Sequence, residues 1–172
     1  MKHGFSLVEL SIVLVILGLL VGGIMLGQNL IRNAEVRSVS AEYERFRGAA
    51  LTFKGQYRGL PGDLPNATRY WGIADGGDGM GADCLYDTSA GTCDGDGDGV
   101  LSLNATMGET FRFWQHLNLA DLLENNYTGA PDCASMSLST PMDRCTTFGV
   151  NTPASKLTDA GWAAINFGRQ TG

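Results

Sequence analysis

Residues 10–27 read LSIVLVILGLLVGGIMLG, a run of 18 residues without a charge. At a rise of about 1.5 Å per residue, a helix of this length nearly crosses a hydrocarbon core of about 30 Å. Including residues 5–8 completes the span but places Glu9 inside it. A carboxylate at the centre of a membrane costs on the order of 2.5–3.5 kcal/mol, and such residues usually have a function. We therefore expect a membrane-spanning helix in which Glu9 has a specific role.

Two ordinary explanations for this segment are weaker. A secretory signal has a shorter apolar stretch, of about 7–15 residues, followed by a small-x-small cleavage site. Here the sequence continues as GQNLIRNAEV (residues 27–36), which contains no such site. A plain signal anchor explains the length of the apolar run but leaves Glu9 unexplained.

The residues around the start of the apolar run have a more specific pattern. Met1-Lys2-His3-Gly4 is followed by Phe5-Ser6-Leu7-Val8-Glu9-Leu10, and this closely resembles the processing site of the type IV pilin and pseudopilin family. The resemblance implies that a prepilin peptidase cleaves after Gly4 and that Phe5 becomes the N-methylated terminus. Glu9 is then the fifth residue of the mature chain. A buried carboxylate is tolerable beside a positive partner, and the freed amine of Phe5 in a neighbouring subunit is such a partner.

Helical periodicity continues beyond the apolar run. Apolar residues recur at spacings of four and three, which describes one face of a helix: Val39, Tyr43, Phe46, Ala50, Phe53 and Tyr57. We predict a single helix from about Phe5 to about Lys54, roughly 75 Å long at the standard rise. Its second half is expected to pack on a soluble domain, the alternative being a coiled-coil partner.

These patterns divide the chain into four segments. We expect a leader at residues 1–4, a transmembrane and assembly helix at 5–27, an amphipathic extension at 28–55, and a periplasmic or extracellular globular domain at 56–172. The family resemblance implies an α+β fold, in which the long helix packs on a small loop-rich domain with an antiparallel sheet.

Local signals place the other elements. Gly55, Gly59 and Pro61-Gly62 are expected to end the long helix. Asp63-Leu64-Pro65 is typical of the cap and first turn of a short helix that ends near Trp71. A second amphipathic helix is predicted from Glu109 to about Asn125, and strands are predicted at residues 145–150 and 162–167.

The four cysteines all follow the apolar run. An even count in a loop-rich region behind a membrane segment favours disulfides and an oxidising compartment. Of the three possible connectivities we favour Cys84–Cys93 with Cys133–Cys145, since short loops close at the least entropic cost.

Residues 94–100 read DGDGDGV and match the first half of an EF-hand calcium loop. Asp94, Asp96 and Asp98 take the ligand positions 1, 3 and 5, and Val100 supplies the backbone carbonyl at position 7. Position 12 is Ala105, so another residue has to complete the site; the candidates are Asn104, Glu109, Asp75, Asp78, Asp83 and Asp87. The alternative is a solvated turn, but three aspartates this close repel one another without a cation. We predict calcium, which some major pseudopilins also bind.

Composition limits the function classes. A net charge of −6 argues against electrostatic DNA binding. Hydrolase, zinc-protease and P-loop motifs are absent, and His116 is expected to be a partly exposed helix residue and not a catalytic base, so we predict no enzyme activity.

The sequence therefore predicts a structural subunit of a type IV pilus or a type II secretion pseudopilus, without deciding between them. Its expected partners are other pilin or pseudopilin subunits, prepilin peptidase and the lipid of the inner membrane. We expect the protein to lie first in the inner membrane, with its globular domain in the periplasm, and later in a filament. The alternative is a membrane-anchored calcium-dependent binding module that does not polymerise.

Overall fold

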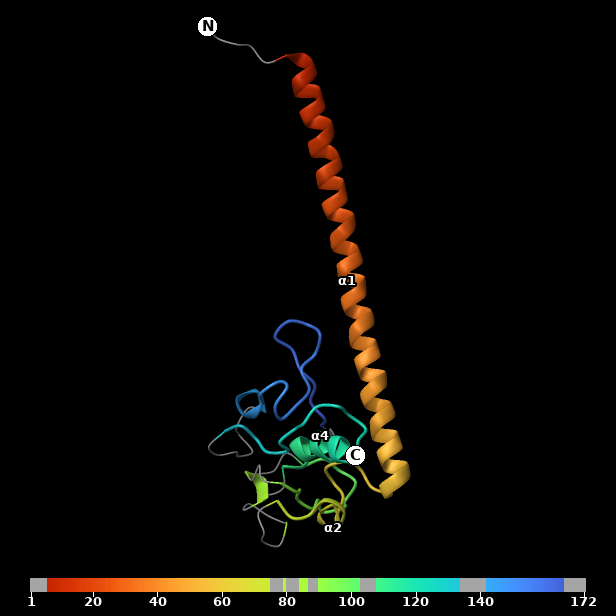
Figure 1. Ribbon diagram of the computed structural model, residues 1–172, viewed down its shortest axis with the longest axis vertical. Helices are drawn as coiled ribbons and strands as arrows, with labels where there is room; N and C mark the ends of the chain where they lie inside the picture. Colours follow the sequence, from red (N-terminus) through yellow and green to blue (C-terminus); the bar gives the residue numbers. More distant parts are fainter. Residues whose placement is uncertain are drawn as a thin grey trace, which may run out of the picture. The chain divides into compact units, whose positions relative to one another are not determined.

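The computed structural model describes residues 6–74, 79, 84–86, 90–102, 108–133 and 142–165. The chain forms two compact units, residues 1–41 and residues 42–172. Its elements in chain order are helix α1 (Leu7–Tyr57), helix α2 (Thr68–Trp71), helix α4 (Glu109–Leu119) and the 3₁₀ helix η1 (Met142–Cys145) (Figure 1). Helix α1 is continuous over 51 residues, as the sequence predicts.

The end of α1 lies three residues beyond the predicted one. Gly55 was expected to stop the helix, but it lies inside the helix, where a glycine costs only about 1 kcal/mol relative to alanine. The helix ends after Tyr57 because Arg58 adopts a left-handed conformation (φ 58°). Phe5, the predicted first residue of the helix, lies outside the described residues.

The last turns of α1 pack on the core of the globular unit. Phe53 is completely buried, and Phe46 and Tyr57 pack against the same cluster. The Phe46 ring lies 5.1 Å from Trp114 in an edge-to-face contact. The prediction that this part of the apolar stripe packs on a soluble domain, and not on a coiled-coil partner, is therefore confirmed at these residues.

The predicted antiparallel sheet is not supported. The described residues form isolated bridges and no strands: Ile73 with Thr92, Phe148 with Thr152, and Ala154 with Gly161. In the first predicted strand, residues 145–150, Cys145 ends η1 and the chain then turns. In the second, residues 162–167, the described residues 162–165 form no strand.

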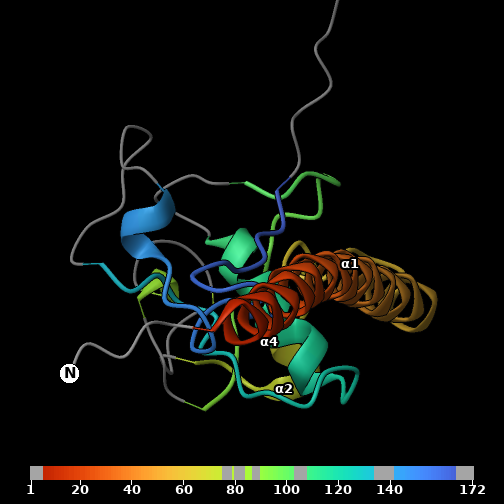
Figure 2. The same ribbon diagram turned by 90° about the horizontal axis from the view of Figure 1, so that it is seen from above.

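Side chains of α4 bind the loop backbone in place of strand partners. Gln115 Nε2 donates hydrogen bonds to the carbonyl oxygens of Gly91 (3.1 Å) and Thr128 (3.0 Å), and Arg112 donates to that of Cys84 (2.6 Å). Figures 1 and 2 show the surrounding loops gathered about α4. Because buried backbone polar groups need partners, these side chains of α4 satisfy carbonyl groups that have no strand partner among the described residues.

Helix α4 ends at Leu119 and not near Asn125. Asp121 is left-handed (φ 55°). Its N–H donates to the carbonyl of Asn118 (2.8 Å), while the Leu122 N–H donates to that of Leu117 (3.0 Å). This is a Schellman motif with an aspartate at the position that usually holds glycine, and the missing glycine explains why the end of the helix was predicted too late.

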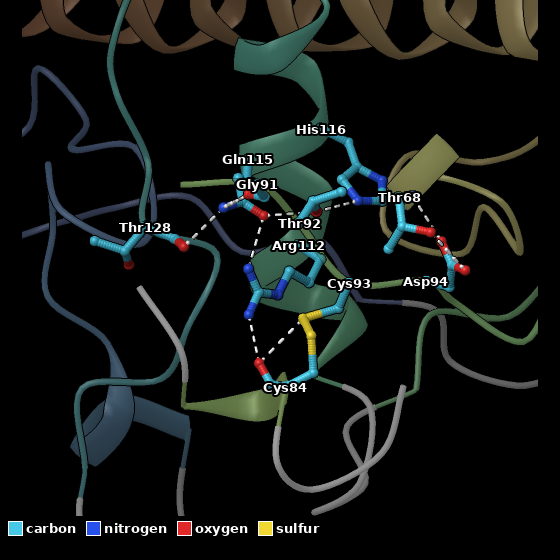
Figure 3. The surroundings of a disulfide bond; sticks show 10 residues. All are labelled: Thr68, Cys84, Gly91, Thr92, Cys93, Asp94, Arg112, Gln115, His116 and Thr128. Carbon is cyan, nitrogen blue, oxygen red and sulfur yellow. Dashed lines mark hydrogen bonds between the residues drawn. A yellow bond between two sulfur atoms is a disulfide. The ribbon is translucent and has the colours of Figure 1, made fainter. Parts of the chain in front are cut away.

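Two disulfides close loops of the globular unit. Cys84 pairs with Cys93 and Cys133 pairs with Cys145, at sequence separations of 9 and 12 residues. These are the pairs expected from loop length. The first lies beside the polar residues of α4 (Figure 3).

Glu42 attaches the loop at residues 155–162 to α1. Its carboxylate accepts hydrogen bonds from Ser155 Oγ (2.8 Å), Lys156 N (2.9 Å) and Trp162 Nε1 (2.9 Å). Burial raises the pKa of Glu42, but these hydrogen bonds outweigh it and the pKa lies below its usual value. The stabilisation that Glu42 provides is therefore present at neutral pH and is lost as the pH falls through the lowered pKa.

Replacing Glu42 by alanine is expected to destabilise the globular unit by about 1–2 kcal/mol, because three donors lose a charged acceptor that is only partly buried. Glu44→Ala is a matched control, since Glu44 forms an exposed pair with Arg47 at 3.4 Å, and such pairs contribute little. Unfolding in denaturant, monitored by tryptophan fluorescence, measures the loss of stability in each variant. Equal effects of the two substitutions would contradict the role of Glu42.

His116 is a buried, neutral member of the α4 network. Its Nδ1 accepts a hydrogen bond from the Gly62 N–H (2.9 Å), so its Nε2 carries the proton and donates to Thr92 Oγ1 (2.8 Å). Burial, with the charge of Arg112 nearby, lowers the pKa of His116 to about 3. The expectation of a partly exposed helix residue is wrong, because His116 is completely buried.

The lowered pKa predicts a loss of stability in weak acid. Below pH 6.5 the unfolded chain protonates His116 and the folded chain does not, so stability falls as the pH falls towards 3. At pH 5 the loss relative to neutral pH is about 2 kcal/mol. In His116→Asn, which keeps an acceptor for Gly62, this part of the pH dependence should disappear. The test is the free energy of unfolding of the wild type and of His116→Asn at pH 7 and at pH 5. If the two proteins lose the same stability between these pH values, the prediction is contradicted.

Candidate functional site

Two features of the chain are candidate functional sites, the start of α1 and an acidic cluster in the globular unit. At the start of α1, the Ser6 N–H donates to Glu9 Oε2 (3.0 Å), and Ser6 Oγ accepts from the Val8 N–H (3.3 Å). This is a capping box, in which a serine and a glutamate three residues later satisfy free N–H groups of the first turn. The spacing Ser6-x-x-Glu9 is the signal in the sequence that could have predicted this cap.

The first part of α1 exposes its apolar side chains. Every large apolar side chain between Leu7 and Ile31 is at least 47% exposed. Among the described residues, α1 is the helix that is long and apolar enough to cross a membrane. Gly4 and Phe5, the predicted cleavage and methylation residues, lie outside the described residues. The exposed surface requires a lipid or protein environment, because it is too large to be left in water.

The acidic cluster joins Asp63, Asp96 and Glu109, whose nearest carboxylate oxygens all lie within 4.8 Å of one another. Asp63 follows α1, Asp96 lies in the DGDGDG loop, and Glu109 is the first residue of α4. Asp63 is 3% exposed and Glu109 is fully buried. Asp96 and Glu109 are predicted ligands, whereas Asp63 was not a candidate.

Both buried carboxylates of the cluster hold the loop by its backbone. Asp63 accepts from the N–H groups of Gly97 (2.7 Å) and Gly99 (2.8 Å). Glu109 accepts from those of Asp96 (3.2 Å) and Ser102 (2.7 Å). The glycines permit this wrapping: an added Cβ at Gly95 would lie 2.5 Å from the Asp63 Cα.

The other predicted ligands are placed differently. Asp94 accepts from Thr68 N (2.7 Å) and Thr68 Oγ1 (3.0 Å), and so fixes the start of α2 (Figure 3). Asp98 is exposed, and its Oδ1 accepts from Val100 N (2.7 Å). The structure therefore does not bring these two carboxylates into the cluster. Five further candidates lie outside the described residues: Asp75, Asp78, Asp83, Asp87 and Asn104.

The surroundings of the cluster disfavour a negative charge on all three carboxylates at once. Burial raises the pKa of Asp63, and the charge of Asp96 adds to this effect. Burial also raises the pKa of Glu109, where the charges of Asp96 and Asp63 act in the same direction. Backbone hydrogen bonds to both carboxylates reduce these shifts without cancelling them. The cluster thus holds hard oxygen donors whose charge a proton or a cation would stabilise.

The comparisons with known proteins identify the first of the two features. Residues 1–25 match the prokaryotic N-terminal methylation motif, which is the signature of type IV pilins and pseudopilins. No curated protein and no solved structure gives a significant match to the chain. The chain therefore carries the N-terminal signature of pilin-type proteins.

Proposed function

We propose that this chain is a structural subunit of a type IV pilus or pseudopilus filament and not an enzyme. The observation that carries the proposal is the methylation motif at residues 1–25, which includes most of the exposed apolar part of α1. Lipid covers such a helix before assembly, and the same helices of neighbouring subunits cover it in a filament.

The proposed sequence of events uses named residues. The helix inserts in the inner membrane, with the globular unit on the periplasmic side. Prepilin peptidase cleaves the bond between Gly4 and Phe5, and the new amine of Phe5 is methylated. In the filament Glu9 leaves its bond to Ser6 N and pairs with the Phe5 amine of a neighbour. One ion pair in apolar surroundings then sets the register between subunits.

The acidic cluster supports a second part of the proposal, in which the globular unit binds calcium through Asp63, Asp96 and Glu109. The three carboxylates fit a calcium ion because they supply closely spaced oxygens from segments that are far apart in sequence. A bound cation would neutralise the cluster and hold the DGDGDG loop against α4. The rival function, a membrane-anchored calcium-binding module that does not polymerise, shares this site and differs in the use of α1.

Assembly distinguishes the two functions. We expect the native protein to occur in high-mass filaments that can be sheared or extracted from the envelope, and to crosslink between subunits near Glu9. A protein that is always a monomer in membrane extracts, under conditions in which its cells assemble filaments, would contradict the filament proposal and leave the tethered module.

A further inference from the structure

Three consecutive Asp-Gly pairs occupy residues 94–99, and the structure holds the nitrogen of each glycine in a hydrogen bond. Gly95 N donates to the carbonyl of Leu64 (3.0 Å). The N–H groups of Gly97 and Gly99 donate to the two carboxylate oxygens of Asp63, at 2.7 Å and 2.8 Å. One buried side chain therefore occupies two of the three nitrogens.

Asp-Gly is a chemically labile pair in a free chain. The glycine nitrogen attacks the side-chain carboxyl carbon of the preceding aspartate, a C–N bond forms, and one carboxyl oxygen leaves as water with the amide proton and a second proton. The succinimide ring then takes up solvent water. If the water adds at the main-chain carbonyl, the original peptide bond breaks and the chain continues through the side chain as isoaspartate, with no net change in composition.

We propose that Asp96 and Asp98 are latent sites of isoaspartate formation and that the Asp63 carboxylate suppresses the reaction at both. The attacking nitrogen has to turn towards the side chain of the preceding aspartate, and a charge-assisted hydrogen bond to the buried Asp63 carboxylate opposes that movement. The aspartates are also engaged, since Asp96 Oδ1 accepts from Asp98 N (3.1 Å) and Asp98 Oδ1 accepts from Val100 N (2.7 Å).

The first pair of the run supplies an internal reference. The carboxylate of Asp94 is bound by Thr68, and Gly95 N is bound by the Leu64 carbonyl. None of these bonds uses the Asp63 side chain. Loss of the Asp63 carboxylate should therefore raise the rate of isoaspartate formation at the second and third pairs and leave the rate at the first pair unchanged. This expectation holds whether or not the chain forms filaments.

The test compares the wild-type full chain with Asp63→Ala, both in detergent with disulfides intact and chelator present, during long incubation at neutral pH. Glu124→Ala, which removes an exposed carboxylate, is the control. Enzymatic methylation of isoaspartate, with peptide mapping, gives the rate at each site. We expect Asp63→Ala to raise the rates at Asp96 and Asp98 by about tenfold, as for the loss of a charge-assisted hydrogen bond, with Asp94 unchanged.

Circular dichroism shows whether the variant remains folded. If Asp63→Ala unfolds, Asp63→Asn replaces it, because its amide oxygen keeps one acceptor; we expect a higher rate at Asp96, at Asp98 or at both. Wild-type rates at both sites in a folded Asp63 variant would overturn the proposal. It would equally be overturned if the folded wild-type chain formed isoaspartate at these sites as fast as the chain in urea.

Discussion

Filament assembly is expected to fail in Glu9→Gln and to continue, at a reduced level, in Ser6→Ala. In the isolated chain Glu9 closes a capping box with Ser6, and glutamine can fill the same position of that motif. Glu9→Gln thus keeps the local cap and removes the charge, whereas Ser6→Ala keeps the charge and removes the side-chain half of the cap.

The two possible roles of Glu9, ion-pair partner and helix cap, differ in the free energy that their loss costs. Loss of one partner of a buried ion pair costs about 3–5 kcal/mol, whereas loss of an N-cap side chain costs about 0.5–2 kcal/mol. If Glu9 pairs with the amine of a neighbouring Phe5, the glutamine variant loses the larger interaction at every subunit. Membrane insertion should not change, because the substitution makes α1 less polar.

The measurement is the yield of filaments relative to membrane-inserted subunits, with Glu9→Leu as the variant that lacks both charge and cap. We expect Glu9→Gln to resemble Glu9→Leu. Normal filaments from Glu9→Gln, together with few from Ser6→Ala, would show that Glu9 acts as a helix cap and not as an ion-pair partner.

Calcium is expected to raise the thermal unfolding temperature of the wild-type globular unit and to have little effect on Glu109→Gln. At a free calcium concentration about 100 times the dissociation constant, binding to the folded state alone adds about 2.7 kcal/mol of stability. The variant lacks the charge of Glu109, one of the three carboxylates of the cluster. Asp132→Asn is a matched control, since the exposed Asp132 accepts a hydrogen bond from Thr147 Oγ1 and is not one of the three carboxylates of the cluster.

The same site predicts a pH dependence of definite sign. The raised pKa values of Asp63 and Glu109 mean that, without metal, these groups favour the folded state most at pH values below their ordinary pKa values, and that this contribution is lost as the pH rises through the raised values. Calcium competes with the protons, so its stabilising effect should grow over the same pH range. Thermal shifts with calcium and with chelator, measured across that range, test both points. Equal shifts in wild type and Glu109→Gln would contradict the site.

The long helix was predictable because its signals are local. Apolar length defined its first half, and the spacing of Phe46, Phe53 and Tyr57 identified the face that packs on the core. The disulfide pairs were predictable because short loops are the easiest to close. Each of these inferences needed only neighbours in the sequence.

The loop packing that replaces the expected strands among the described residues, and part of the acidic cluster, could not be predicted, because both depend on contacts between distant segments. The predicted strands fail where backbone groups find side-chain partners: Asn151 Nδ2, for example, donates to the carbonyls of Cys145 (2.7 Å) and Ala130 (3.2 Å). Asp63 reads in the sequence as a helix cap beside a proline. Only the folded chain places its carboxylate under the DGDGDG loop.

The mass of the N-terminal peptide of the protein isolated from its native host tests the central claim most directly. We predict a chain that begins at Phe5, lacks residues 1–4 and carries one additional methyl group on the Phe5 nitrogen. A chain that still begins at Met1, in cells that process and assemble their other pilin-type proteins, would contradict the account.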